Sequence, residues 1–171
     1  MHDSRLANLL GAAAVNVADR LTAAAASAAG ASTSGTAALI TLAGQPGIGV
    51  TELGARIGLS QPACARMLDQ LTARGLVRRR QGSGRSVPVH LTRSGAAAAR
   101  RALREREREL VALLDRLTPA QQDELAGILE PLLEGLFHQA GSQHVVCRLC
   151  DHAACIANDC ACPVGQAARA E

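Results

Sequence analysis

The chain has 171 residues, which is enough for one domain with an appendage. Its residues are 48% apolar, but Phe137 is the only aromatic residue among them. This composition excludes a pocket lined by aromatic rings and a platform on which single-stranded bases stack. All 18 basic residues are arginine, so lysine Schiff bases and lysine-bearing phosphate loops are also excluded. The 35 alanines favour a core of closely packed helices.

The net charge of +3 hides an uneven distribution along the chain. Residues 50–108 contain thirteen arginines and four acidic residues, whereas residues 109–134 contain six acidic residues and one arginine. A basic segment of this kind is typical of a surface that binds a polyanion. The alternative is an ordinary solvated charged surface.

The first segment, residues 1–34, predicts one long helix of about 22 residues, because its apolar residues recur at steps of three and four. A second helix is predicted at residues 35–43, capped by Ser32, Thr33 or Ser34. Two more long helices are predicted at residues 93–117 and 120–139. The first of these has four leucines that we expect to point inward: Leu103, Leu110, Leu113 and Leu114.

Between these helices, the segment 35–92 combines a helix-turn-helix pattern with a hairpin. Thr51 is expected to cap a short helix that ends at Gly58, and Ser60 to cap the next helix. Residues 76–80 and 86–91 predict two strands around a glycine-rich loop. The predicted fold class is therefore mainly α: a winged helix-turn-helix with a small two- or three-stranded antiparallel β wing.

A helix of this kind fits the major groove of double-stranded DNA. Gln61 and Arg66 are the best candidates for base contacts, because glutamine suits adenine and arginine suits guanine. Arg85 at the wing tip is expected to enter the minor groove, and the arginines before the loop to contact phosphate. The predicted DNA-binding residues are Ser60, Gln61, Pro62, Ala63, Ala65, Arg66, Arg78, Arg79, Arg80 and Arg85. Cys64 shares an apolar stripe with Met67, Leu68 and Leu71, so we expect it to be a core residue rather than a sensor.

Two segments carry these features: VTELGARIGLSQPACARMLDQLTARGLVRRR and, after a gap, VPVHLTRSG. With the long helices on either side, they resemble the MarR-type transcriptional regulators over about residues 6–139. The resemblance implies a homodimer whose two recognition helices enter successive major grooves of a palindromic operator. It also implies that residues 1–34 and 93–140 form the dimerisation region, and that Arg85 matches the wing arginine of the family.

The final segment, residues 141–171, has a different character. It contains five of the six cysteines: Cys147, Cys150, Cys155, Cys160 and Cys162. Thiols this close together are typical of a metal site, because a short loop can wrap them around one ion. The all-thiolate set and the Cys-Pro ending are similar to ferredoxin ligand runs, which favours an iron-sulfur cluster slightly over Zn²⁺. Four ligands suffice, so either Cys160 or Cys162 is spare. Two alternatives are redox-active thiols without metal and an ordinary tail, and His144 or His152 could replace a ligand.

The N-terminus lacks the pattern of a secretory signal, and no segment is expected to span a membrane, which places the chain in the reducing cytoplasm. The leading hypothesis is a homodimeric repressor, not an enzyme. Its affinity for a palindromic operator would be modulated by a cysteine-ligated iron-sulfur cluster or by another metal or redox signal. One alternative is a small-molecule-responsive repressor with a structural zinc tail. Another is a thiol oxidoreductase or metal-transfer protein.

Overall fold

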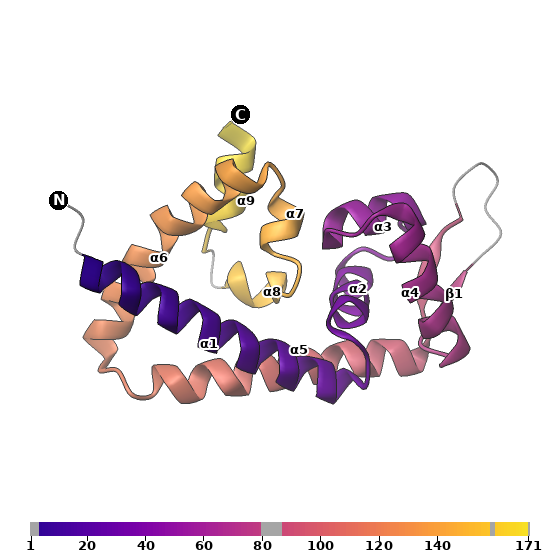
Figure 1. Cartoon of the computed structure of the whole chain (residues 1–171), viewed down its shortest axis with the longest axis horizontal. Helices are drawn as coiled ribbons and strands as arrows, with labels where there is room; N and C mark the ends of the chain where they lie inside the picture. The colour runs from indigo at the N-terminus through magenta and orange to yellow at the C-terminus, as the bar shows by residue number, and fades with distance from the viewer. Residues whose placement is uncertain (1–3, 80–86, 158–159, 171) are drawn as a thin grey trace.

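The computed structural model describes residues 4–79, 87–157 and 160–170 (Figure 1). Its elements are, in chain order, α1 (Ser4–Ala29), α2 (Thr33–Gly44), α3 (Val50–Ile57), α4 (Gln61–Ala73), β1 (Val77–Arg79), β2 (Val89–Leu91), α5 (Arg93–Leu114), α6 (Pro119–Ala140), α7 (Gln143–Val146), α8 (His152–Cys155) and α9 (Pro163–Ala170). The predicted fold class is confirmed, since two short antiparallel strands accompany a mainly helical chain. The three short helices of the tail were not predicted.

The long helices α1 and α5 pack along one another and form the base of the molecule (Figure 1). An ion pair of 2.9 Å joins Arg20 to Glu109 across them, and Arg101 donates a hydrogen bond of 3.0 Å to the carbonyl oxygen of Ala28. The prediction for the inward face of α5 was wrong. Its buried residues are Gly95, Ala98, Ala99 and Ala102, whereas Leu114 is exposed and the other three leucines are only half-buried. Small side chains face the neighbouring helices because they let the backbones approach closely.

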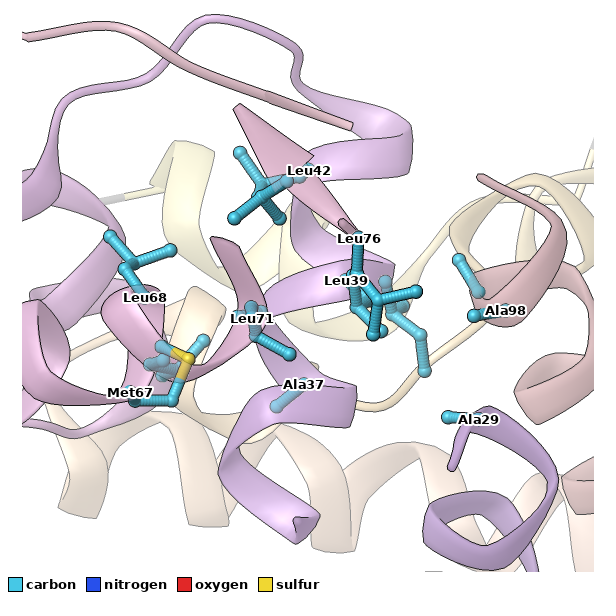
Figure 2. Packing of buried hydrophobic residues seen from close by; sticks show 14 of the residues in the cluster. Ala29, Ala37, Leu39, Leu42, Met67, Leu68, Leu71, Leu76 and Ala98 are labelled. Atoms are coloured by element: carbon cyan, nitrogen blue, oxygen red, sulfur yellow. The ribbon is translucent and has the colours of Figure 1, made fainter. Parts of the chain in front are cut away.

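The core surrounds α2. The ends of α1 and α5 lie on one side of this helix, and the helix-turn-helix lies on the other. Figure 2 shows Leu39 and Leu42 of α2 among side chains from α1, α4 and α5. Seven of the twelve residues of α2 are buried, so this helix is enclosed on most sides. The core is built from aliphatic residues, alanine, one methionine and Cys64, as the lack of aromatic residues required.

Local sequence signals explain most of the helix ends. Gly58 ends α3 in the left-handed conformation with φ of 72°, as predicted. The side chain of Ser32 accepts a hydrogen bond from the Gly35 amide and caps α2. The prediction for the start of α3 was wrong, because the helix begins at Val50 after Gly49 and Thr51 lies inside it. Ser60 occupies the N-cap position of α4 without a capping hydrogen bond from its side chain.

The wing pairs β1 with β2 in antiparallel register, from Val77 opposite Leu91 to Arg79 opposite Val89. A single bridge from Pro88 to Gly49 attaches the wing to the segment that precedes α3. Proline at this position fits an edge, because it has no amide hydrogen to donate. The strand that contains β2 therefore pairs with β1 on one side and with the segment before α3 on the other.

One expectation about α1 needs correction. By length and composition, α1 is apolar enough to cross a membrane, although no such segment was expected. This is weak evidence for a span, because core helices of soluble proteins and signal sequences meet the same criterion. Its Ala25 and Ala29 are buried in the core, and its apolar residues near the N-terminus are exposed.

Candidate nucleic-acid interface and cysteine cluster

Helix α4 divides its residues cleanly between two faces. Cys64, Met67, Leu68 and Leu71 are buried against the core, as their spacing predicted. The opposite face presents Gln61, Pro62 and Arg66 to solvent just after the exposed Ser60, and Ala63 and Ala65 are half-buried beside them. The predicted groove-binding residues therefore share one accessible surface at the start of the helix.

The arginines at the end of β1 point in different directions. Arg79 forms an ion pair of 2.8 Å with Asp69, and its guanidinium donates a hydrogen bond of 3.2 Å to the carbonyl oxygen of Ala65. This side chain thus ties the wing to α4. A phosphate contact was predicted for it, and its geometry adds a positioning role that the sequence did not indicate.

Gln61, Ala65 and Arg79 come together at one hollow between α3, α4 and the wing. The hollow has a volume of about 670 Å³ and is also lined by Val50 and Val87. Gln61, for which a base contact was predicted, and Arg79, for which a phosphate contact was predicted, therefore face the same concave surface.

Arg78 lies elsewhere. It lines a separate hollow with His90, Pro46 and Arg100, next to α2 and α5, because successive residues of a strand point to opposite faces. Arg78 therefore does not share the hollow of Gln61. The predicted residues Arg80 and Arg85 lie outside the described residues.

Cys64 has no exposed surface, and burial raises the pKa of its thiol, although Arg79 acts in the opposite direction. Thiolate is the reactive form of cysteine, so we expect Cys64 of the native protein to resist alkylation at neutral pH. Cys160 is exposed and serves as the internal control. Mass spectrometry after brief treatment with iodoacetamide should find Cys160 modified and Cys64 intact. Rapid modification of both would contradict the buried position of Cys64.

The five cysteines of the tail are not equivalent. Cys147, Cys150, Cys155 and Cys162 are half-buried, whereas Cys160 is exposed. Burial raises the pKa of Cys147 to about 11, and the thiols of Cys150 and Cys162 contribute to the increase. Burial likewise raises the pKa of Cys155 to about 11, again with contributions from Cys150 and Cys162. The thiols of Cys147 and Cys155 are therefore mostly protonated at neutral pH. Among the described residues, no three histidine, cysteine or acidic side chains are already arranged to hold a metal ion.

The tail packs against the region of the helix-turn-helix. Leu149, between two of the cysteines, packs against the main core. The Nη1 atom of Arg56, in α3, lies 3.5 Å from Nδ1 of His144. The same guanidinium donates hydrogen bonds to side-chain oxygens of Glu52 and Gln45. Burial and the adjacent Arg56 lower the pKa of His144, so its neutral ring can accept the arginine hydrogen.

A cavity of about 130 Å³ marks this junction. It is lined by α2 and α3 on one side and by the tail on the other: Ile40, Thr41, Gly44, Gln45, Arg56, His144, Cys147, Arg148, Cys150 and His152. No local pattern predicts this contact, because it joins residues about one hundred positions apart.

Comparison with known proteins places this geometry in a family. The model of the MarR family matches residues 33–87. The MarR family protein Rv2887 of Mycobacterium tuberculosis, crystallised with salicylic acid, is 32% identical, and the match covers 77% of this chain and 98% of that one with a TM-score of 0.58. The same protein crystallised with DNA matches at 29% identity over 76% and 98% of the two chains, with a TM-score of 0.62.

YusO from Bacillus subtilis shares the fold at 21% identity, with a TM-score of 0.66 over 75% of this chain and 92% of that one. No curated protein sequence matches the chain. The match to Rv2887 covers nearly the whole of that protein, and the matched region includes the helix-turn-helix described above. The chain belongs to the MarR family of DNA-binding transcriptional regulators, which are not enzymes.

Proposed function

We propose that this protein is a cytoplasmic, homodimeric repressor that binds a palindromic operator, and that the state of its cysteine tail sets its operator affinity. The observation that carries the proposal is the accessible polar face of α4, which lies beside a wing and includes Gln61 and Arg66. A relative of known structure has been crystallised with DNA.

Exposed apolar residues support the dimer. Large apolar side chains on α1 and on α6 are 42–64% exposed in the single chain: Leu6, Leu9, Leu10, Val15, Ile128, Leu129, Leu132 and Leu136. Apolar surface of this extent favours association, because burial removes it from water. A second copy of the chain is the partner that the family relationship favours, and it gives α1 a role that needs no membrane.

The tail is the proposed point of entry for the signal. Its four half-buried thiols are suited to a soft metal centre, and we favour an iron-sulfur cluster over Zn²⁺ because a cluster responds to redox conditions. A reversible change of the thiols themselves is the alternative without metal. In each case the signal arises beside the DNA-binding region, because Leu149 and His144 contact it.

A second candidate is a repressor that responds to an organic molecule and uses the tail only as a structural zinc site. This candidate is supported by the relative Rv2887, which has been crystallised with salicylic acid and with p-aminosalicylic acid. Against it, the only aromatic residue of this chain, Phe137, is buried in the packing of α6. A flat aromatic ligand would therefore find no exposed phenylalanine, tyrosine or tryptophan ring to stack on.

The test begins with selection of binding sites from random double-stranded DNA by the purified full-length protein. We expect an enriched palindrome, and its affinity is then measured with metal-loaded and metal-free protein. Failure to enrich any sequence would refute the repressor. Equal affinity in the two states would refute the sensing role and leave the repressor intact.

Within this proposal, Arg66→Ala should remove one base contact in each half-site. The expected loss is about 1–3 kcal/mol per half-site, together with relaxed specificity at one base pair. Fluorescence anisotropy with the selected operator and with single-base variants measures both effects. Arg116→Ala, in the turn between α5 and α6, is the control and should leave operator affinity unchanged. A variant Arg66→Ala that binds every operator as the wild type does would exclude this base contact.

A further inference from the structure

A hollow beside the wing gathers basic side chains from three elements. It has a volume of about 320 Å³, and its basic lining residues are Arg78 of β1, His90 of β2 and Arg100 of α5. The rest of the lining is apolar and includes the buried Leu42 and the half-buried Leu91. Among the described residues, no acidic side chain lines the hollow, and the three basic side chains have no hydrogen bond or ion pair.

We propose that this hollow binds the phosphate group of a small ligand, and that Arg78, His90 and Arg100 hold that group. The site is separate from the cysteine tail and from the surface proposed for the operator. It assigns Arg78 to a free anion, whereas the sequence suggested a contact with a phosphate of DNA.

The register of the wing places two of the three basic groups on one face. Arg78 and His90 are directly opposite each other in the pairing of β1 with β2. Side chains at opposite positions of an antiparallel pair share a face, with Cβ atoms about 4.5–5.5 Å apart. Arg79, the next residue of β1, points to the other face and pairs with Asp69 of α4.

Backbone hydrogen bonds hold the walls of the hollow in place. The Gly47 amide, in the turn after α2, donates a hydrogen bond of 2.9 Å to the Val89 carbonyl oxygen of β2. The Thr92 amide donates one of 3.0 Å to the Leu76 carbonyl oxygen and so joins the start of α5 to the start of β1. The ring of His90 lies close to the turn, since an added Cβ atom at Gly47 would be 3.2 Å from its Cε1 atom. The backbone that carries the three basic side chains is therefore organised before a ligand binds, which lowers the cost of binding.

The charge of the hollow selects the ligand. The guanidinium groups of Arg78 and Arg100 are permanently charged, and a doubly charged phosphate group balances both of them. A guanidinium can donate two parallel hydrogen bonds to a phosphate, and such charge-assisted bonds are stronger than neutral ones. His90 adds a ring N–H, which both the neutral and the protonated imidazole provide. The lining contains no aromatic ring, so recognition depends on charge and not on stacking.

A free ligand fits this hollow better than the operator backbone does. The surface proposed for the operator is the polar face of α4, and Arg79 faces that helix through its hydrogen bond to the Ala65 carbonyl oxygen. Arg78 faces the opposite side, toward α2 and α5. A duplex that lies along α4 would have to pass around the wing to reach the hollow.

Isothermal titration calorimetry of the full-length protein tests the site. The probes are inorganic phosphate and pyrophosphate, and sodium chloride at matched ionic strength controls for general screening. We expect saturable binding of at least one probe at one site per chain. Absence of saturable binding of both probes would overturn the proposal, and so would an equal response to chloride.

Two variants locate the bound probe. Arg78→Gln and Arg100→Gln should each weaken binding by about 10- to 100-fold, because each removes hydrogen bonds to a charged group. Both side chains are exposed, so the variants should fold, and circular dichroism checks this. Arg116→Gln makes the same change of charge in the turn between α5 and α6, outside the hollow, and should keep the wild-type affinity. Unchanged affinity in both hollow variants, or an equal loss in Arg116→Gln, would place the anion elsewhere and overturn the proposal.

Operator binding distinguishes a free ligand from the DNA backbone. Arg100 is not among the predicted DNA-binding residues, so Arg100→Gln should bind the selected operator with the wild-type dependence on salt concentration. A slope of log affinity against log salt that is smaller by about one would assign the hollow to a DNA phosphate and overturn the proposal. If no operator is selected, the repressor is refuted, and calorimetry still decides whether the hollow binds phosphate.

Discussion

Gly95→Ala is expected to destabilise the protein by about 3 kcal/mol or more, because no side chain fits between α5 and the segment that ends the helix-turn-helix. A Cβ atom at Gly95 would lie 1.9 Å from the carbonyl oxygen of Leu76 and 2.9 Å from its carbonyl carbon. These are backbone atoms, so relief requires movement of α5 itself. Thr92 prevents that movement, since its amide and its hydroxyl bond to the Leu76 and Gly75 carbonyl oxygens at 3.0 and 2.6 Å.

Urea unfolding followed by circular dichroism measures the loss. Gly127→Ala makes the same chemical change on α6, where an added Cβ meets no atom within 4 Å. This control should leave the stability unchanged or raise it by about 0.5–1 kcal/mol, because alanine favours a helix more than glycine does. Equal stability of Gly95→Ala and wild type would mean that α5 is not held against Leu76 as described.

Leu132→Glu is expected to convert the dimer to monomers and to weaken operator binding by about 10²- to 10⁴-fold, since the two half-sites would no longer be bound together. Leu132 is 42% exposed in the single chain and shares a face of α6 with Ile128 and Leu136. A carboxylate buried there against a second copy would be desolvated without a partner.

Sedimentation velocity gives the oligomeric state, and anisotropy gives the operator affinity. Ile156→Glu provides the control, because Ile156 is 43% exposed but belongs to the tail and to neither α1 nor α6. It should remain dimeric. A dimeric Leu132→Glu variant would show that this face of α6 is not the interface.

The helix-turn-helix was the part of the fold most open to prediction. The three- and four-residue spacing of Cys64, Met67, Leu68 and Leu71 fixes which face of α4 is buried, and the polar residues between them then have to face solvent. Gly58 marks the end of α3 because few other residues adopt its left-handed conformation. These signals act within a few residues, so the sequence expresses them directly.

Leucine spacing was misleading in α5. Leu103, Leu110, Leu113 and Leu114 suggested the inward face, but alanines occupy it and the leucines lie at least partly toward solvent. Periodicity identifies an apolar face without specifying what covers it. In α5 the close approach of α1 and α2 favours the smallest side chains, whereas leucines of α6 are exposed in the single chain.

The role of Arg79 and the place of the tail also depended on contacts between distant residues. Arg79 meets Asp69 only after β1 folds back along α4, and Leu149 reaches the core only after α6 reverses the direction of the chain. No spacing rule predicts such pairs, because the side chains are brought together by packing of whole elements.

The sequence by itself determined the aliphatic core, the faces of the recognition helix, the wing and the cysteine-rich tail, since each follows from composition or from local spacing. Tertiary structure decided that Arg78 and Arg79 serve different surfaces, that Cys160 stands apart from the other four tail cysteines, and that the tail rests against α3. The physical reason is the same in each case. Burial and proximity are properties of packed elements, and local sequence fixes the elements but not their neighbours.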